Sequence, residues 1–172
     1  AGGTFTLDTQ NNAITTLAGN TGAVSFQDNS GFAIDTVNTV GLTTSGATTL
    51  YSTGTVTQTA TGAVSATTLT LDGLAGVFTL DTANNAVTSL DANNAVLGTL
   101  RFRDDTGLDV VGITVGANNA TLQSVGGTVT QSGTINAAGL ELLGAGGTFT
   151  LDTQNNAITT LAGNTGAVSF QD

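Results

Sequence analysis

The sequence predicts an all-β, three-faced parallel β-solenoid. Three observations support this fold class: a long perfect repeat, short runs of alternating apolar residues, and turn residues between the runs. The segment Ala1–Asp28 recurs without a difference at Ala145–Asp172, which sets a period of 144 residues. Identity at 28 positions is more than folding requires, because packing tolerates substitutions that conserve volume. Self-similarity at a fixed period is typical of arrays in which each unit completes the core of the next.

A second, weaker repeat lies inside this period. The segment Ala1–Leu17 is echoed by Ala75–Leu90, and Thr55–Gln58 matches Thr128–Gln131. One aromatic position recurs at intervals of 73 and then 71 residues, as Phe5, Phe78 and Phe149. The period therefore contains two diverged half-repeats of about 72 residues each.

These repeats predict a single solenoid segment over residues 1–172. Its 144-residue repeat covers 1–144 and restarts at 145–172, and its half-repeats are 1–74 and 75–144. The chain begins without Met and stops inside a strand-like run, which favours a window on a longer polymer over a recent duplication.

Short runs with a period of two residues indicate strands along the whole chain. Alternate residues of a strand face opposite sides, so Phe5 and Leu7 should point one way while Thr4 points the other. No segment keeps helical spacing of its apolar residues for long enough to form a helix. We expect three strands in each coil of about 24 residues, about six coils per period, and one continuous apolar column inside. A sandwich of hairpins is the alternative all-β layout, but it does not explain the nested repeats.

The turns between the runs are rich in Asn and Gly. Both residues tolerate a positive φ, which corners between the faces of a solenoid require, and stacked Asn side chains can bond to one another in ladders. We interpret the pairs as corner residues and not as a binding site. They are Asn11-Asn12, Asn84-Asn85, Asn93-Asn94, Asn118-Asn119, Asn155-Asn156, Gly2-Gly3 and Gly126-Gly127.

Composition argues against several classes of partner. The net charge is −10, and Arg101 and Arg103 are the only cationic side chains. A surface of this charge repels nucleic acid and anionic lipid, so we expect neither as a partner. No apolar run approaches the roughly 18 residues that span a bilayer, so we expect no membrane insertion of this segment. The absence of Cys removes disulfides and thiol chemistry.

Several motifs carry a resemblance to a known family: Thr4–Asp8, Asn11–Leu17, Gly41–Gly46, Gly54–Gln58 and Gly139–Gly144. Their succession, which covers essentially the whole chain, resembles the repeat region of filamentous-haemagglutinin-type large exoproteins and adhesins. The resemblance implies a right-handed parallel β-helix and export across an outer membrane. It also implies a place outside the cell or on the bacterial cell surface, as part of a long fibre.

The residues needed for most enzyme chemistry are missing. There is no His, Lys or Cys, which removes Ser-His triads, His proton shuttles, Schiff bases and the commonest zinc ligands. Carboxylate pairs, which glycosidases use, remain available. The densest acidic group is Asp104, Asp105 and Asp109.

We interpret this acidic group as a charged corner, with Arg101 and Arg103 facing outward and pairing with nearby Asp side chains. A Ca²⁺ site and a catalytic pair at Asp104, Asp105 and Asp109 are the alternatives. We therefore predict no catalytic, cofactor-binding or metal residue, and no enzyme activity. Three further carboxylates end equivalent strands and should bond to nearby backbone N–H groups: Asp8, Asp81 and Asp152.

The predicted function is the structural shaft of an extracellular filament or surface adhesin. Its expected partners are copies of the same repeat, joined end to end covalently or by stacking, and cell-surface or matrix components. A ligand-binding adhesin should show a non-repeating insertion or an exposed aromatic cluster, and we find neither in the sequence.

The alternative is a secreted solenoid that binds ice or that binds or processes carbohydrate. Thr-x-Thr pairs fit the ice-binding pattern, although other residues should interrupt them on the same face: Phe32–Asp35, Phe78–Leu80 and Leu108–Val110. The pairs are Thr4/Thr6, Thr55/Thr57, Thr128/Thr130 and Thr148/Thr150.

Overall fold

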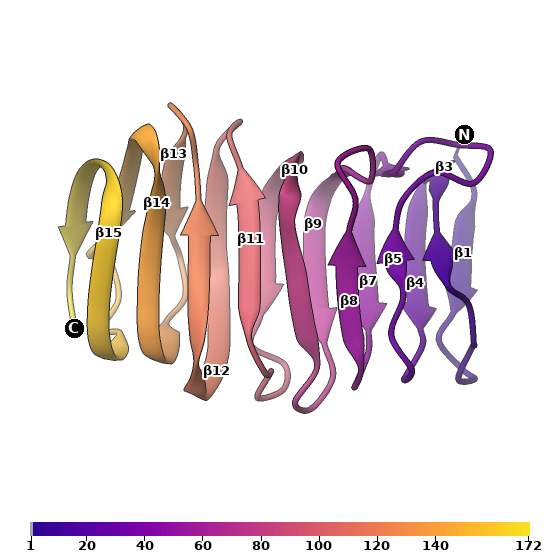
Figure 1. Ribbon diagram of the computed structural model, residues 1–172, viewed down its shortest axis with the longest axis horizontal. Helices are drawn as coiled ribbons and strands as arrows, with labels where there is room; N and C mark the ends of the chain where they lie inside the picture. The colour runs from indigo at the N-terminus through magenta and orange to yellow at the C-terminus, as the bar shows by residue number, and fades with distance from the viewer. Residues whose placement is uncertain (1) are drawn as a thin grey trace.

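The computed structural model describes residues 2–172, which form fifteen strands and no helix (Figure 1). Every ladder between the strands is parallel, and all the strands belong to one sheet that winds into about eight coils. The predicted fold class, an all-β parallel β-solenoid, is confirmed. In Figure 1 the near strands point up, the far strands point down and the chain advances from right to left, so the winding is right-handed.

The strands lengthen toward the C-terminus, where they continue around corners of the solenoid. In chain order they are β1 (Thr4–Leu7), β2 (Thr16–Leu17), β3 (Gly19–Thr21), β4 (Ala23–Gln27), β5 (Ala33–Ile34), β6 (Leu42–Thr44), β7 (Ala47–Tyr51), β8 (Thr55–Gln58), β9 (Val64–Asp72), β10 (Val77–Ala92), β11 (Leu100–Asp104), β12 (Leu108–Gln123), β13 (Thr128–Gln131), β14 (Ile135–Leu151) and β15 (Ala157–Phe170).

Three stacks of strands form the wall of the N-terminal half. The first contains β1, β4, β7 and the end of β9. The second contains β2, β5, β8 and the start of β10. The third contains β3, β6, the start of β9 and the middle of β10. Each coil therefore contributes one strand to each of three stacks, as the sequence predicts.

The coils are shorter than expected from the sequence. Along the first stack Phe5 pairs with Val24, Val24 with Thr48, Thr48 with Leu69 and Leu69 with Leu90, at spacings of 19, 24, 21 and 21 residues. The typical coil has about 21 residues, so a 144-residue period spans about seven coils, whereas we expected coils of about 24 residues and six per period. Fewer residues suffice because long strands such as the 17-residue β14 turn corners without a loop.

A half-repeat of about 72 residues then spans about three and a half coils. Equivalent segments of the two half-repeats consequently lie on opposite faces of the solenoid. Both β8 and β13 have the sequence Thr-Val-Thr-Gln, and Figure 1 shows β8 on the near side and β13 on the far side.

The core is one apolar column that runs along the axis. Every coil contributes to it, and no coil could exclude water from its own apolar residues alone. Phe26 and Phe32 meet edge to face, with ring centroids 5.2 Å apart. The largest fully buried side chains are Phe78, Phe102, Phe149, Ile34, Leu42, Leu50, Leu69, Leu71, Leu80, Leu90, Leu97 and Leu100.

Positive φ angles occur at glycine and not at asparagine. In residues 2–172 eight glycines and Ala75 adopt them, so the expectation that Asn residues use a positive φ at corners is wrong. Gly73 and Gly144 hold equivalent corners, with φ of 126° and 117°. At each, a Cβ would lie 2.0 Å from the carbonyl oxygen of the preceding coil, Ser52 O or Ser124 O, so only glycine fits.

One loop interrupts the regular wall. Between β5 and β6 the segment 35–41 leaves the solenoid and folds back through an antiparallel bridge between Thr36 and Val40. Val37 and Val40 are 61% and 63% exposed there. At the equivalent place in the other half-repeat, β12 continues without a break. The sequence interpretation that no non-repeating insertion exists is therefore wrong.

Candidate functional sites

The most elaborate polar arrangement is a buried corner around Asn85. Its Nδ2 donates to Leu80 O and Arg103 O, both at 2.9 Å. Its Oδ1 accepts from Gln58 Nε2 at 2.6 Å and from Val64 N at 2.8 Å. One side chain thus joins its own coil to the coils before and after it.

Asp104 in the following coil completes this corner. Its Oδ2 accepts from Val87 N at 2.7 Å. Its Oδ1 accepts from Thr106 N at 2.8 Å and Thr106 Oγ1 at 2.7 Å. We call the set of Gln58, Asn85 and Asp104 a polar corner, because the three side chains together fix the register of three successive coils.

The polar corner recurs in the other half-repeat. Gln131 Nε2 donates to Asn156 Oδ1, which also accepts from Ile135 N at 2.9 Å. Asp172 Oδ1 accepts from Ile158 N at 2.8 Å. These three bonds match those that Gln58, Val64 and Val87 donate in the first corner.

A third, shorter version lies near the N-terminus. Asn12 Nδ2 donates to Leu7 O at 2.8 Å and Gln27 O at 3.0 Å, and Asp28 Oδ2 accepts from Ile14 N at 2.8 Å. Asn12, Asn85 and Asn156 are corner residues, as the sequence predicts, but the expected Asn–Asn ladders are wrong: the bonds run from Gln to Asn and from backbone N–H to Asp. Gln58 and Gln131 were not predicted as corner residues, although each ends a recurring Thr-Val-Thr-Gln strand with its side chain directed inward.

Hydrogen bonding controls the charge of the buried carboxylate at the N-terminal corner. Burial alone would raise the pKa of Asp28. Bonds from Ser30 Oγ and from the N–H groups of Ile14, Ser30 and Gly31 outweigh burial, so the pKa of Asp28 is lowered from its ordinary value. The carboxylate is therefore held in its ionised form by protein donors.

The acidic group Asp104, Asp105 and Asp109 does not converge on one point. Asp104 is buried in the polar corner, and Asp105 Oδ2 accepts from Arg103 at 2.5 Å. Asp109 Oδ2 accepts from Ser132 Oγ at 2.6 Å, one coil further on. Across residues 2–172 the structure shows no group of three His, Cys, Asp or Glu side chains that could hold a metal ion.

Burial alone would also raise the pKa of Asp105. The hydrogen bond from Arg103, the N–H of Val125 and the charge of Arg103 outweigh burial, so the pKa of Asp105 is lowered. The same hydrogen bond raises the pKa of Arg103 against the opposing effect of burial.

The expectation that both arginines pair with nearby Asp side chains is confirmed. Arg101 Nε donates to Asp81 Oδ2 at 2.7 Å, and Arg103 pairs with Asp105. The expectation that Asp8, Asp81 and Asp152 bond to local backbone is wrong, because each accepts from a side chain of the next coil. Ser25 Oγ donates to Asp8 Oδ2 at 2.5 Å, and Ser169 donates to Asp152.

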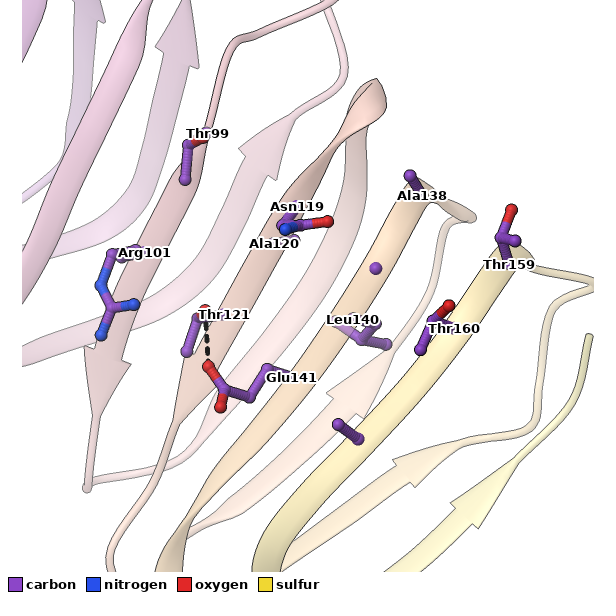
Figure 2. Close-up of a pocket in the computed structure, with 12 residues that line it drawn as sticks. Thr99, Arg101, Asn119, Ala120, Thr121, Ala138, Leu140, Glu141, Thr159 and Thr160 are labelled. Atoms are coloured by element: carbon purple, nitrogen blue, oxygen red, sulfur yellow. Dashed lines mark hydrogen bonds between the residues drawn. The ribbon is translucent and has the colours of Figure 1, made fainter.

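A shallow groove of about 590 Å³ crosses the outer face formed by β11, β12, β14 and β15. Figure 2 shows Arg101 at one end of it and Glu141 turned toward Thr121, which donates to Glu141 Oε2 at 3.2 Å. Glu141 is the only carboxylate among the twelve lining residues, whereas glycosidases use two. None of those residues is aromatic.

The Thr-x-Thr pairs do not form one uninterrupted array. Thr4 pairs with Ala23 and Thr6 with Ser25, and Thr130 lies beside Asp109. Thr55 and Thr57 lie on β8, across the solenoid from the pair on β13 (Figure 1). Ice binding, which needs a regular face, gains no support from this register.

Within residues 2–172 the structure contains no helix with the length and hydropathy to cross a membrane. No protein-family model matches the chain, and neither a curated protein nor a solved structure matches it.

Proposed function

We propose that residues 1–172 form a segment of the structural shaft of an extracellular filament or surface adhesin built from tandem β-solenoid repeats, without catalysis. The observation that carries this proposal is the second copy of the 28-residue segment. Thr4–Leu7 pairs with Ala23–Phe26, and Thr148–Leu151 pairs with Ala167–Phe170 in the same register. One period thus ends in the geometry with which it begins, and further periods can be added without a change in the wall.

The chemistry of the side chains supports a structural function. The densest carboxylates are used in hydrogen bonds between coils, and the charged groups of the outer groove already have protein partners. A continuous backbone ladder along the axis makes such a rod stiff, and each added coil extends it by about 4.8 Å.

The test is the mass of the intact chain under denaturing conditions, from native material, together with electron micrographs of that material. A chain many times larger than 16.9 kDa that forms thin fibres would establish a covalent tandem array. A chain near 16.9 kDa in fibres would establish stacked subunits. Small discrete particles at that mass would refute the shaft.

A further inference from the structure

The same 28-residue sequence occurs in two different environments within one molecule. Phe5 and Leu7 are 52% and 46% exposed, whereas their counterparts Phe149 and Leu151 are completely buried. The difference comes from β13, which lies against the second copy: Thr128 pairs with Thr148 and Val129 pairs with Phe149. No strand in residues 2–172 lies against β1 on the corresponding side.

The open end at β1 is apolar and also contains a hollow. A hollow of about 190 Å³ lies there, lined by apolar side chains that include Phe5, Leu7, Leu17, Val24 and Leu42. Around the corner, Asn12 Nδ2 donates to Leu7 O and Gln27 O, as Asn156 Nδ2 donates to the equivalent Leu151 O and Gln171 O. No residue within 2–172 takes the place that Gln131 has beside Asn156.

We propose that the end formed by residues 2–27 is a docking surface for residues 128–143 of a second copy of this unit. In this joint Thr128 pairs with Thr4, Val129 covers Phe5, and Gln131 donates to Asn12. Residues 128–143 are the proposed occupant because, within one chain, they already cover segment 145–172, whose sequence is identical to that of residues 1–28. The inference rests on the proposed function, since a shaft of such units requires this joint.

The proposed joint is polar, and between separate chains it requires one segment to leave. It is head to tail, so it does not close on itself and propagates into a filament. Between separate chains, residues 2–27 of one copy must displace segment 145–172 of the other copy from its pairing with residues 128–143. The strand pairing that breaks and the strand pairing that forms involve the same residue types, so the exchange resembles domain swapping between copies.

The sequence has no Cys, so disulfide trapping can test the register without background. A Thr4→Cys chain is mixed with a Thr128→Cys chain under mild oxidation and run on a non-reducing gel. Cα atoms that face each other in adjacent strands are about 4.8 Å apart, which a disulfide can bridge. We expect a linked dimer in at least tenfold excess over the matched control, Thr4→Cys mixed with Thr55→Cys.

The control is matched because Thr55 holds the same place in β8 that Thr128 holds in β13, and both are exposed. In the next coil Thr55 pairs with Val77 of the same chain, which belongs to the diverged copy Ala75–Leu90 and not to an identical copy of the docking end. The diverged copy lies in the middle of the chain and is held by the coils on both sides, so we expect residues 2–27 of another chain not to displace it. Adding Phe149→Ala to the Thr128→Cys chain should raise the yield further, because it loosens the segment that must leave. Equal yields in all three mixtures would overturn the inference.

The outcomes separate this inference from the proposed function. Long native fibres without trapping would leave the shaft standing and remove docking between separate copies. Trapping with this register, but small particles in native material, would keep the docking surface and refute the shaft.

Discussion

Gln58 Nε2 donates to Asn85 Oδ1 across a coil boundary at 2.6 Å, and both side chains are buried. A Gln58→Ala substitution removes this bond and the acceptor of Ala83 N. We expect it to lower the free energy of unfolding by about 1–3 kcal/mol, the usual cost of leaving buried polar groups unpaired. Urea unfolding followed by circular dichroism measures this. Gln10→Ala, at an exposed position, is the control and should stay within about 0.5 kcal/mol of the unsubstituted chain.

Ser52 and Ser124 are both fully buried, and they form a second matched pair. Ser52 Oγ accepts from Gly54 N at 3.1 Å, whereas Ser124 Oγ has no hydrogen-bond partner within residues 2–172. We expect Ser52→Ala to cost about 0.5–1.5 kcal/mol and Ser124→Ala to be neutral or stabilising. A larger loss for Ser124→Ala than for Ser52→Ala in urea unfolding would contradict this account.

Gly144 and Gly126 separate steric contact from backbone strain. An Ala at Gly144 would combine a φ of 117° with a Cβ placed 2.0 Å from Ser124 O. An Ala at Gly126 would meet a φ of 75° but no atom within 4 Å. We expect losses of about 1–2 kcal/mol for Gly126→Ala and distinctly more for Gly144→Ala, by the same unfolding measurement. Similar losses at the two positions would contradict this account, because they would show that the preceding coil, which contains Ser124, shifts to make room for the added Cβ.

Acid should destabilise the fold through Asp28 and Asp105, whose pKa values are both lowered in the folded chain. A lowered folded pKa means that the unfolded chain binds more protons as the pH falls. The stabilisation is therefore present above the unfolded pKa of about 3.9 and is lost as the pH falls through the lower folded pKa. Melting temperatures should be nearly constant above about pH 5 and should decline below about pH 4.

An Asp28→Asn variant should show a shallower decline, because one of these carboxylates no longer titrates. Repeating the series at high salt screens repulsion between surface charges and so isolates the contribution of the hydrogen-bonded groups. A melting temperature that rises steadily from pH 5 to pH 3 would rule out this account.

The architecture could be predicted from the sequence because the repeats carry it. Identity between 1–28 and 145–172, with alternating runs between them, leaves few folds other than a solenoid. The coil length was harder to predict, because a strand that turns a corner without a loop looks the same in sequence as one that ends there. Register is decided by which backbone groups meet in the next coil, and a period of 144 residues fits six or seven coils nearly as well.

The loop at 35–41 and the partner of Gln58 in the polar corner are two further features that could not be predicted from the sequence. Thr and Val favour strands, so Thr36–Val40 resembles its neighbours in composition although it leaves the wall. The inward phase of Gln58 could have been read from its alternation with Val56, and its recurrence as Gln131 was visible. Its partner could not be predicted, since Asn85 lies 27 residues away and meets it only through stacking.

If such units were joined in a tandem array, the half-coil left over in each half-repeat of about three and a half coils would decide on which side of the array each feature recurs. A feature that occurs once in each half-repeat would appear on both sides in turn, as the strands β8 and β13 do on the near and far sides of Figure 1. The loop at 35–41 occurs once in a period of about seven coils, so in a tandem array it returns to the same flank each time. At about 4.8 Å per coil, the exposed Val37 and Val40 would recur along one flank of such an array at intervals of about 34 Å.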